Sequence, residues 1–138
     1  MYQDYLETLE AGIWRHSKTQ GLYLLLGVGS ILTPFDDIAL LSCIGPGTYS
    51  EAPLRPLAVY LDMSRIRPNG QWVVEPLGSD ISSTKPGQKF VVYSRLGTDD
   101  EANGRLWVRP LEGPAGWIMP VTIGGLSRPR FTFFRTSL

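Results

Sequence analysis

Apolar side chains follow two different spacings along the chain. Within residues 2–11, four aromatic or aliphatic residues recur at helical intervals: Tyr2, Tyr5, Leu6 and Leu9. Gly12 follows them, at the place where a left-handed residue commonly ends a helix. After Gly12 the helical period is replaced by short apolar runs between turn residues. The spacing therefore predicts a short N-terminal helix at residues 1–11 and β-structure in the rest of the chain.

Short apolar or β-branched runs, bounded by turn residues, predict the strands. These runs are residues 21–29, 38–44, 57–62, 71–75, 89–96, 105–108, 117–121 and 130–134. Gly27 and Gly29 predict a bulge or bend in the first run. Gly45-Pro46-Gly47 is expected to end the second run. Closely spaced short strands are typical of small barrels. The expected fold class is mainly β, with one or two small SH3-like β-barrels after the helix.

A pattern of residues occurs twice within these runs. Residues 38–45 align with residues 90–97, and residues 54–57 align with residues 108–111, where both copies contain Arg-Pro-Leu. Because both matches occur in the same order, duplication is the favoured interpretation. The boundary is expected in the polar, turn-rich residues 76–88. This division gives a first β module at residues 12–77 and a second, truncated module at residues 78–138, packed on the first.

Composition supports β-structure and excludes several classes of protein. The 15 glycines and 11 prolines among 138 residues disfavour long helices, because both residues disrupt helix interiors. A net charge of zero argues against non-specific nucleic-acid binding, which needs excess cationic charge. The single cysteine cannot form an internal disulfide, no signal-peptide pattern is present, and no apolar run could span a bilayer. We therefore expect a cytoplasmic protein without membrane contact.

The residues also resemble a known family. Gly12-Ile-Trp-Arg-His-Ser-Lys18 and the following Gly21-Leu-Tyr-Leu-Leu-Leu-Gly27 resemble the opening of a small bacterial family called domain of unknown function 1653. Val91-Val92-Tyr93, Leu106-Trp-Val-Arg-Pro-Leu111 and Arg128-Pro-Arg-Phe131 are similar to its second half and its ending. About sixty residues separate the two halves here. The resemblance implies a family domain followed by a shortened copy, or one domain with an insertion. It implies a small β-barrel and no particular activity.

The sequence offers little for catalysis. His16 is the only histidine, and Cys43 lies within an apolar run where a thiol is expected to be inert core. No Gly-x-Ser-x-Gly nucleophile motif is present. The acidic clusters at residues 36–37 and 99–101 fall in predicted turns, where aspartate usually bonds to nearby backbone. We therefore predict no catalytic residue, no metal site and no cofactor. A His16 ring bonded to backbone is favoured over a hydrolase that uses this residue.

Cationic and aromatic residues recur together and indicate a binding site. The predicted ligand-binding residues are Trp14, Arg15, His16, Lys18, Tyr23, Arg55, Trp107 and Arg109. Arginine binds phosphate or carboxylate through two parallel hydrogen bonds, and aromatic faces stack on bases. If the two modules pack together, Arg15 and Arg109 could converge on one anion. In the alternative interpretation the Arg-Pro-Leu arginines, Arg55 and Arg109, pair with Asp62 or Glu112 inside the protein.

Two functions remain open from the residues. The first is a non-enzymatic binding module for a small anionic ligand such as a nucleotide, which would sense or sequester that signal. The second is a protein-interaction or self-assembly module, in which exposed strand edges or Phe131-Thr-Phe133-Phe134 bind a partner or a second copy.

Overall fold

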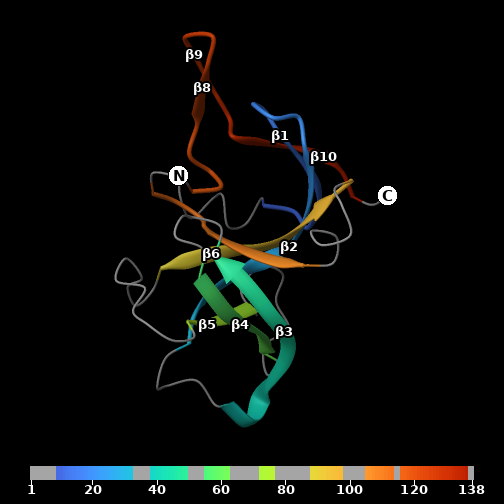
Figure 1. Ribbon diagram of the computed structural model, residues 1–138, viewed down its shortest axis with the longest axis vertical. Helices are drawn as coiled ribbons and strands as arrows, with labels where there is room; N and C mark the ends of the chain where they lie inside the picture. Colours follow the sequence, from blue (N-terminus) through green and yellow to red (C-terminus); the bar gives the residue numbers. More distant parts are fainter. Residues whose placement is uncertain are drawn as a thin grey trace.

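The computed structural model describes residues 9–32, 38–49, 55–62, 72–76, 88–97, 105–113 and 116–136 (Figure 1). The described elements are strands and one short 3-10 helix. They are β1 Gly12–His16, β2 Leu22–Ile31, the 3-10 helix Ile38–Leu40, β3 Leu41–Tyr49, β4 Arg55–Asp62, β5 Trp72–Pro76, β6 Lys89–Leu96, β7 Leu106–Pro110, β8 Val121–Ile123, β9 Leu126–Arg128 and β10 Phe131–Arg135. No helix among the described residues is long and apolar enough to cross a membrane.

Six strands close into one barrel. Their order is β2-β5-β4-β3-β7-β6, and β6 pairs again with β2. The pairs β2–β5 and β3–β7 are parallel and the other pairs are antiparallel. Each barrel strand therefore has a partner on both sides, which satisfies its backbone hydrogen-bonding groups. The prediction of a mainly β fold built on a small barrel is confirmed.

The long strand β2 connects the barrel to a smaller sheet extension. One edge of β2 pairs with β6 along most of its length, while the other edge pairs first with β1 and then with β5. β10 adds to the outer edge of β1, and the β8–β9 hairpin projects from the same end of the barrel (Figure 1). The register shifts between Leu25 and Gly27, so the bulge predicted near Gly27 is confirmed. This bulge lies close to the point where β2 changes partner from β1 to β5.

The apolar core has two parts that share β6. Side chains alternate between the two faces of a strand, and in β6 all four residues from Phe90 to Tyr93 are buried. Phe90 and Val92 join one cluster inside the barrel, with members such as Leu57, Val59 and Val108. Val91 and Tyr93 join a second, aromatic cluster. A strand buried on both faces gives a continuous apolar sequence rather than an alternating one.

The aromatic cluster lies between the barrel wall and the β1–β10 extension. Its buried members are Leu9, Leu25, Val28, Val91, Tyr93, Trp107, Leu111, Trp117 and Phe131. Trp14, Tyr23 and Ile118 pack against it. Trp117 and Phe131 are stacked, with ring centroids 3.7 Å apart and ring planes 8° apart. These large side chains attach the extension to the barrel by burying apolar area.

Several expected elements differ from the structure. Of the predicted helix at residues 1–11, residues 1–8 lie outside the described residues, and residues 9–11 are not helical. Residues 117–119 form a turn, so the strand predicted at residues 117–121 is wrong apart from its last residue. Their apolar side chains fill the aromatic cluster without belonging to a sheet. Strands β1 and β9 were not predicted, because both are short and carry polar residues, and only the first residue of β8 lay in a predicted strand.

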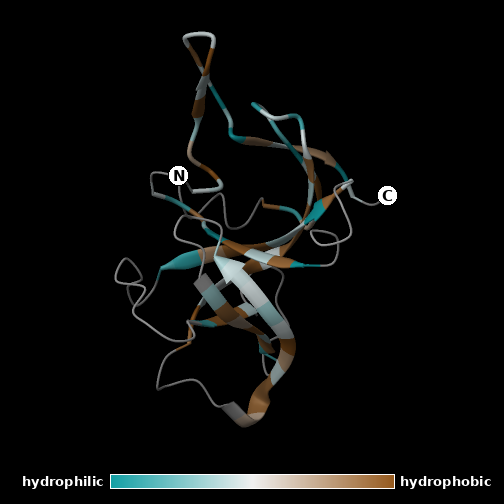
Figure 2. Cartoon of the chain, in the orientation of Figure 1, coloured by the Kyte–Doolittle hydropathy of each residue, from teal (hydrophilic) through white to brown (hydrophobic). Residues whose placement is uncertain are grey.

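Strand β3 also departs from expectation. It continues through Gly45-Pro46-Gly47, which was expected to end it, because β4 pairs with it along its whole length. The predicted strand began at Ile38, but residues 38–40 form the 3-10 helix. Cys43 is exposed, so its prediction as core is wrong. Leu40 and Ile44 are also exposed, because the start of β3 extends past the core; Figure 2 shows this apolar segment at the bottom of the view.

The predicted modules at residues 12–77 and 78–138 contribute to the same barrel. β2, β3, β4 and β5 come from the first range, and β6 and β7 come from the second. The boundary itself lies outside the described residues. The hairpins β3–β4 and β6–β7 also pair differently: Pro110 is opposite Phe90, whereas Pro56, its equivalent in the repeat, is opposite Thr48. The internal repeat therefore stays a prediction from the sequence.

Candidate functional site

Strand β1 distributes the predicted ligand-binding residues over two faces. Trp14 and His16 alternate with Arg15, so their side chains leave opposite faces of the strand. Trp14 and His16 contact aromatic rings on the core face, whereas the Arg15 guanidinium lies 4.5 Å from the centroid of the Phe134 ring. The neighbours on β10 alternate in the same way. The β1–β10 extension therefore has an aromatic face toward the core and a cationic face away from it.

The aromatic residues among the predicted ligand-binding residues lie on the core face. Trp14 makes edge contacts with Trp117 and Phe133, at centroid distances of 5.9 and 5.4 Å. Tyr23 lies edge-on to Tyr93 and Phe131. Trp107 is buried, and the Arg95 guanidinium covers its ring at 4.0 Å. These rings pack mainly on one another and on arginine. Core packing therefore explains why they recur in the sequence.

His16 organises the turn between β1 and β2. Its Nδ1 accepts hydrogen bonds from the backbone N–H groups of Lys18 and Thr19, at 3.1 and 3.3 Å. The imidazole is buried, and its ring meets Phe131 edge-on at 4.9 Å. An Nδ1 atom that accepts hydrogen bonds carries no proton, so this arrangement fits the neutral ring. The expectation of a histidine bonded to backbone is confirmed.

Burial and nearby positive charges favour the neutral form of His16. Burial lowers the pKa of the imidazole from its ordinary value of 6.5, and the positive charges of Arg109, Arg130 and Lys18 lower this pKa further. Protonation would therefore place a fourth positive charge in a cationic, partly dehydrated region. His16 is a positioning residue for the turn, and its ring is already engaged with backbone and aromatic partners.

Arg15 and Arg109 do not converge. The Arg109 guanidinium lies 5.5 Å from the centroid of Phe131, which is a core-face residue of β10. Arg15 lies on the other face of the same extension, over Phe134. Lys18 is exposed in the turn, and the side chain of Arg55 lies outside the described residues. The structure therefore brings Trp14, His16, Tyr23, Trp107 and Arg109 to one face and separates Arg15 from them.

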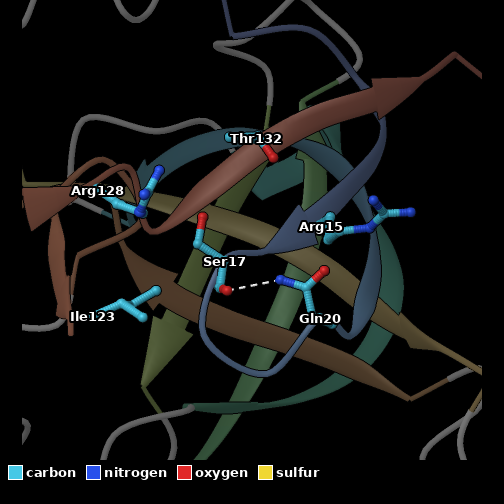
Figure 3. Close-up of a pocket in the computed structure, with 6 residues that line it drawn as sticks. All are labelled: Arg15, Ser17, Gln20, Ile123, Arg128 and Thr132. Carbon is cyan, nitrogen blue, oxygen red and sulfur yellow. Dashed lines mark hydrogen bonds between the residues drawn. The ribbon is translucent and has the colours of Figure 1, made fainter. Parts of the chain in front are cut away.

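An open cleft lies on the Arg15 side of the extension. Its volume is about 380 Å³, and the described residues that line it come from four strands and the β1–β2 turn: Arg15, Ser17, Gln20, Ile123, Arg128 and Thr132. Figure 3 shows Ser17 and Thr132 in the middle, with Arg128 on one side and Arg15 and Gln20 on the other. We call this the Arg15–Arg128 cleft. Its described lining contains two arginines, two hydroxyls and one amide, and no carboxylate.

Hydrogen bonds hold the β1–β2 turn in place beside this cleft. The Ser17 backbone N–H donates to the carbonyl of Arg130 at 2.8 Å, and the Ser17 hydroxyl donates to the carbonyl of Pro129. The Gln20 side-chain amide donates to the carbonyl of Ser17 at 2.7 Å, as Figure 3 shows. These bonds attach the turn to the segment between β9 and β10, so both walls of the cleft are fixed relative to one another.

Gln20 has an unusual backbone conformation. Its φ is +65°, and no other non-glycine residue among those described has a positive φ. This conformation costs about 1–2 kcal/mol for a residue with a Cβ. The structure keeps it at a residue whose side chain lines the cleft. Retained strain of this kind is concentrated at functional sites.

Sequence reasoning missed most of the cleft. It identified Arg15 but not Ser17, Gln20, Arg128 or Thr132. The Gly124-Gly125 turn, with φ of +57° and +80°, was a signal for the β8–β9 hairpin that brings Arg128 to the cleft. Nothing in the linear sequence places Thr132 next to Arg15; their pairing in the sheet does so.

The described residues hold no metal-binding cluster of three or more histidine, cysteine, aspartate or glutamate side chains.

No protein-family model, no curated protein and no solved structure matches the chain. The resemblance to domain of unknown function 1653 therefore stays a prediction that rests on its residues.

Proposed function

We propose that this protein binds a small anionic ligand, of the phosphate-bearing kind found in nucleotides, in the Arg15–Arg128 cleft, and that it acts by binding rather than by catalysis. The observation that carries this proposal is the composition of the cleft lining: two arginines with hydroxyl and amide groups, and no carboxylate among the described residues. A volume of about 380 Å³ lies in the range of small-molecule sites.

The geometry of Arg15 supports anion binding. Its guanidinium lies over the face of Phe134, at 4.5 Å from the ring centroid. A guanidinium held over a ring by cation–π attraction can still donate hydrogen bonds to an oxyanion. Packing on the ring also restricts the side chain before a ligand arrives, which reduces the entropy lost on binding. Arg128 is exposed at the opposite wall and supplies the second charge.

Charge in this end of the molecule favours the same ligand class. Arg15, Lys18, Arg128, Arg130 and Arg135 all lie in β1, the β1–β2 turn, β9, β10 or the short segments next to them. Positive charges in one region attract an anion through their summed field, although the chain has no net charge.

A thermal-shift experiment tests the proposal. Inorganic phosphate, pyrophosphate, nucleoside mono- and triphosphates, and uncharged nucleosides are added separately to the protein. A ligand at about one hundred times its Kd adds about 2.7 kcal/mol to the free energy of unfolding. For a domain of this length such a change raises Tm by on the order of 10 °C. We expect a rise with at least one phosphate compound and none with the nucleosides.

Charge-removing variants connect the shift to the cleft. Arg15→Gln and Arg128→Gln should each remove most of the rise. Arg105→Gln is the matched control, because Arg105 is an exposed arginine that does not line the cleft. If no phosphate compound raises Tm, or if the rise survives the loss of both cleft arginines, anion binding in this cleft is rejected.

Four finer predictions accompany this proposal. They are the SH3-like class of the barrel, a cytoplasmic location, membership of the resembling family, and a possible homo-oligomer. The closed barrel and the residues quoted above support the first and third of these.

A further inference from the structure

Strand β10 is the outermost strand of the large sheet. It pairs with β1 on one side, and no described strand pairs with its other side (Figure 1). Its residues from Thr132 to Arg135 are exposed. Proteins usually protect such an edge with proline, an inward-pointing charge or a covering segment. Phe131–Arg135 contains no proline, and its only charged residue, Arg135, lies at the end of the strand.

The hydrogen bonds show which backbone groups face this open edge. The His16 N–H donates to Gly21 and its carbonyl accepts from Gln20, so the backbone groups of His16 point toward β2. Neighbouring residues of a strand point their backbone groups in opposite directions. Arg15 therefore points toward β10, where it pairs with Thr132. The N–H and C=O groups of Phe131 and Phe133 consequently point away from β1, toward the open edge.

Side chains beside this edge differ on the two faces. Phe133 is 39 % exposed on the aromatic face, next to Trp14. Phe134 is 42 % exposed on the opposite face, where Arg15 and Arg135 lie over its ring at 4.5 and 5.2 Å. A strand added here would place alternate side chains beside Phe133 and beside the two arginines. The edge thus matches a segment in which apolar and acidic residues alternate.

We propose that the open edge of β10 binds an extended acidic segment of a partner protein, which adds to the sheet as a further strand. Charge complementarity selects this occupant over a second copy of the chain. The segment from Arg128 to Arg135 contains three arginines and no acidic residue. Pairing of two such segments would bring two positively charged segments together with no acidic residue between them, which is unfavourable. An acidic partner instead meets the arginines with opposite charge.

Peptide binding tests the proposal directly. A fluorescent, capped hexapeptide of alternating glutamate and valine is titrated with the protein, and its fluorescence anisotropy is measured. The matched peptide replaces every glutamate with lysine. We expect the acidic peptide to bind and the basic peptide to bind at least about tenfold more weakly, with affinity for the acidic peptide falling as salt screens the charges. Equal binding of both peptides, or no binding of the acidic one, overturns the proposal.

Two further tests examine strand addition. Phe133→Pro removes an outward N–H without removing a hydrogen bond to β1, and should abolish binding, whereas Phe133→Ala should retain part of it. Methylated peptides test the same point without altering the protein: the amides of the valines are methylated in one peptide and those of the glutamates in another. Only one of the two sets faces β10, so one peptide must lose binding and the other must keep it. Equal tolerance of both modifications overturns strand addition.

Sedimentation of the protein alone distinguishes the competing occupant. The proposal requires that no second copy of the chain occupies the β10 edge in the absence of peptide. A dimer that Phe133→Pro dissociates would assign the edge to a second copy and overturn the proposal. Phosphate-induced stabilisation through the Arg15–Arg128 cleft should persist in Phe133→Pro, because Phe133 does not line the cleft. The two proposals can therefore fail separately.

Discussion

Replacement of Gly29 by alanine should force apart the backbones of β2 and β5, which approach closely at this residue. Gly29 in β2 lies opposite Trp72 in the parallel pairing with β5. A Cβ at Gly29 would lie 2.2 Å from the carbonyl oxygen of Trp72 and 2.5 Å from its carbonyl carbon. Ordinary contacts begin near 3.4 Å, so the two backbones would have to separate by about 1.2 Å. The backbone of Trp72 has little freedom to move, because β4 pairs with β5 on its other side.

The expected loss of stability follows from this geometry. Overpacking costs about 1–3 kcal/mol, and each hydrogen bond lost between β2 and β5 adds about 1 kcal/mol. We therefore expect Gly29→Ala to reduce the free energy of unfolding by about 4 kcal/mol, out of a total of about 5–15 kcal/mol for an ordinary domain. In a urea titration followed by tryptophan fluorescence, the midpoint should fall by about 2 M.

Two other glycines provide the comparison. At Gly27 a Cβ would meet the Trp72 indole at 2.1 Å, but these are side-chain atoms that can move, so Gly27→Ala should be less destabilising than Gly29→Ala. Gly97 has φ +70°, and apart from its own neighbours along the chain no described residue has an atom within 4 Å of the position that a Cβ would occupy there. Gly97→Ala should therefore cost only the backbone strain of about 1–2 kcal/mol. If Gly29→Ala reduces the free energy of unfolding no more than Gly97→Ala does, the close approach of β2 and β5 is not the reason that residue 29 must be glycine.

Two further predictions concern single residues of the chain. The NMR titration of His16 should have its midpoint below 6.5, and Arg109→Gln should move it upward, because burial and then Arg109 lower this pKa. The unfolded chain binds this proton more tightly than the folded protein does. The contribution of His16 to the free energy of unfolding should therefore be fully present above pH 6.5 and decrease as the pH falls toward the pKa of the folded state. A free energy of unfolding that stays constant over that pH range would contradict the assignment. Cys43 should react with a thiol reagent in the folded protein at about the rate of a free thiol, because it is exposed; protection until unfolding would contradict this.

The sequence predicted well the strands that consist of continuous apolar, β-branched and aromatic residues. Lys89–Leu96 is a largely apolar run that is buried on both faces at its centre, and its predicted bounds are those of β6. The glycines of β2 likewise predicted its bulge. These features depend on local chemistry: β-branched and aromatic residues favour strands, and glycine permits an irregular backbone.

Burial was predicted less well than strand position. Cys43 lies in a run that looks like core, but half of β3 extends beyond the barrel and leaves this residue exposed. Trp117 looked like a strand residue, but its indole stacks on Phe131 from a turn. The hydrophobic effect depends on the apolar area that is buried and has no preferred direction. An apolar side chain can therefore enter the core from a strand or from a turn, and its residue type does not show which.

The candidate site was visible in the sequence only in part. The residues themselves established a mainly β protein with one histidine, and with arginines close to aromatic rings. Only the tertiary structure separated Arg15 from Arg109, because alternation along β1 and its pairing with β10 place the two on opposite faces. The tertiary structure also brought Arg128 and Thr132 to Arg15 across more than one hundred residues of sequence. Such long-range pairing is decided by which strands share a sheet, and local residue preferences carry no information about that choice.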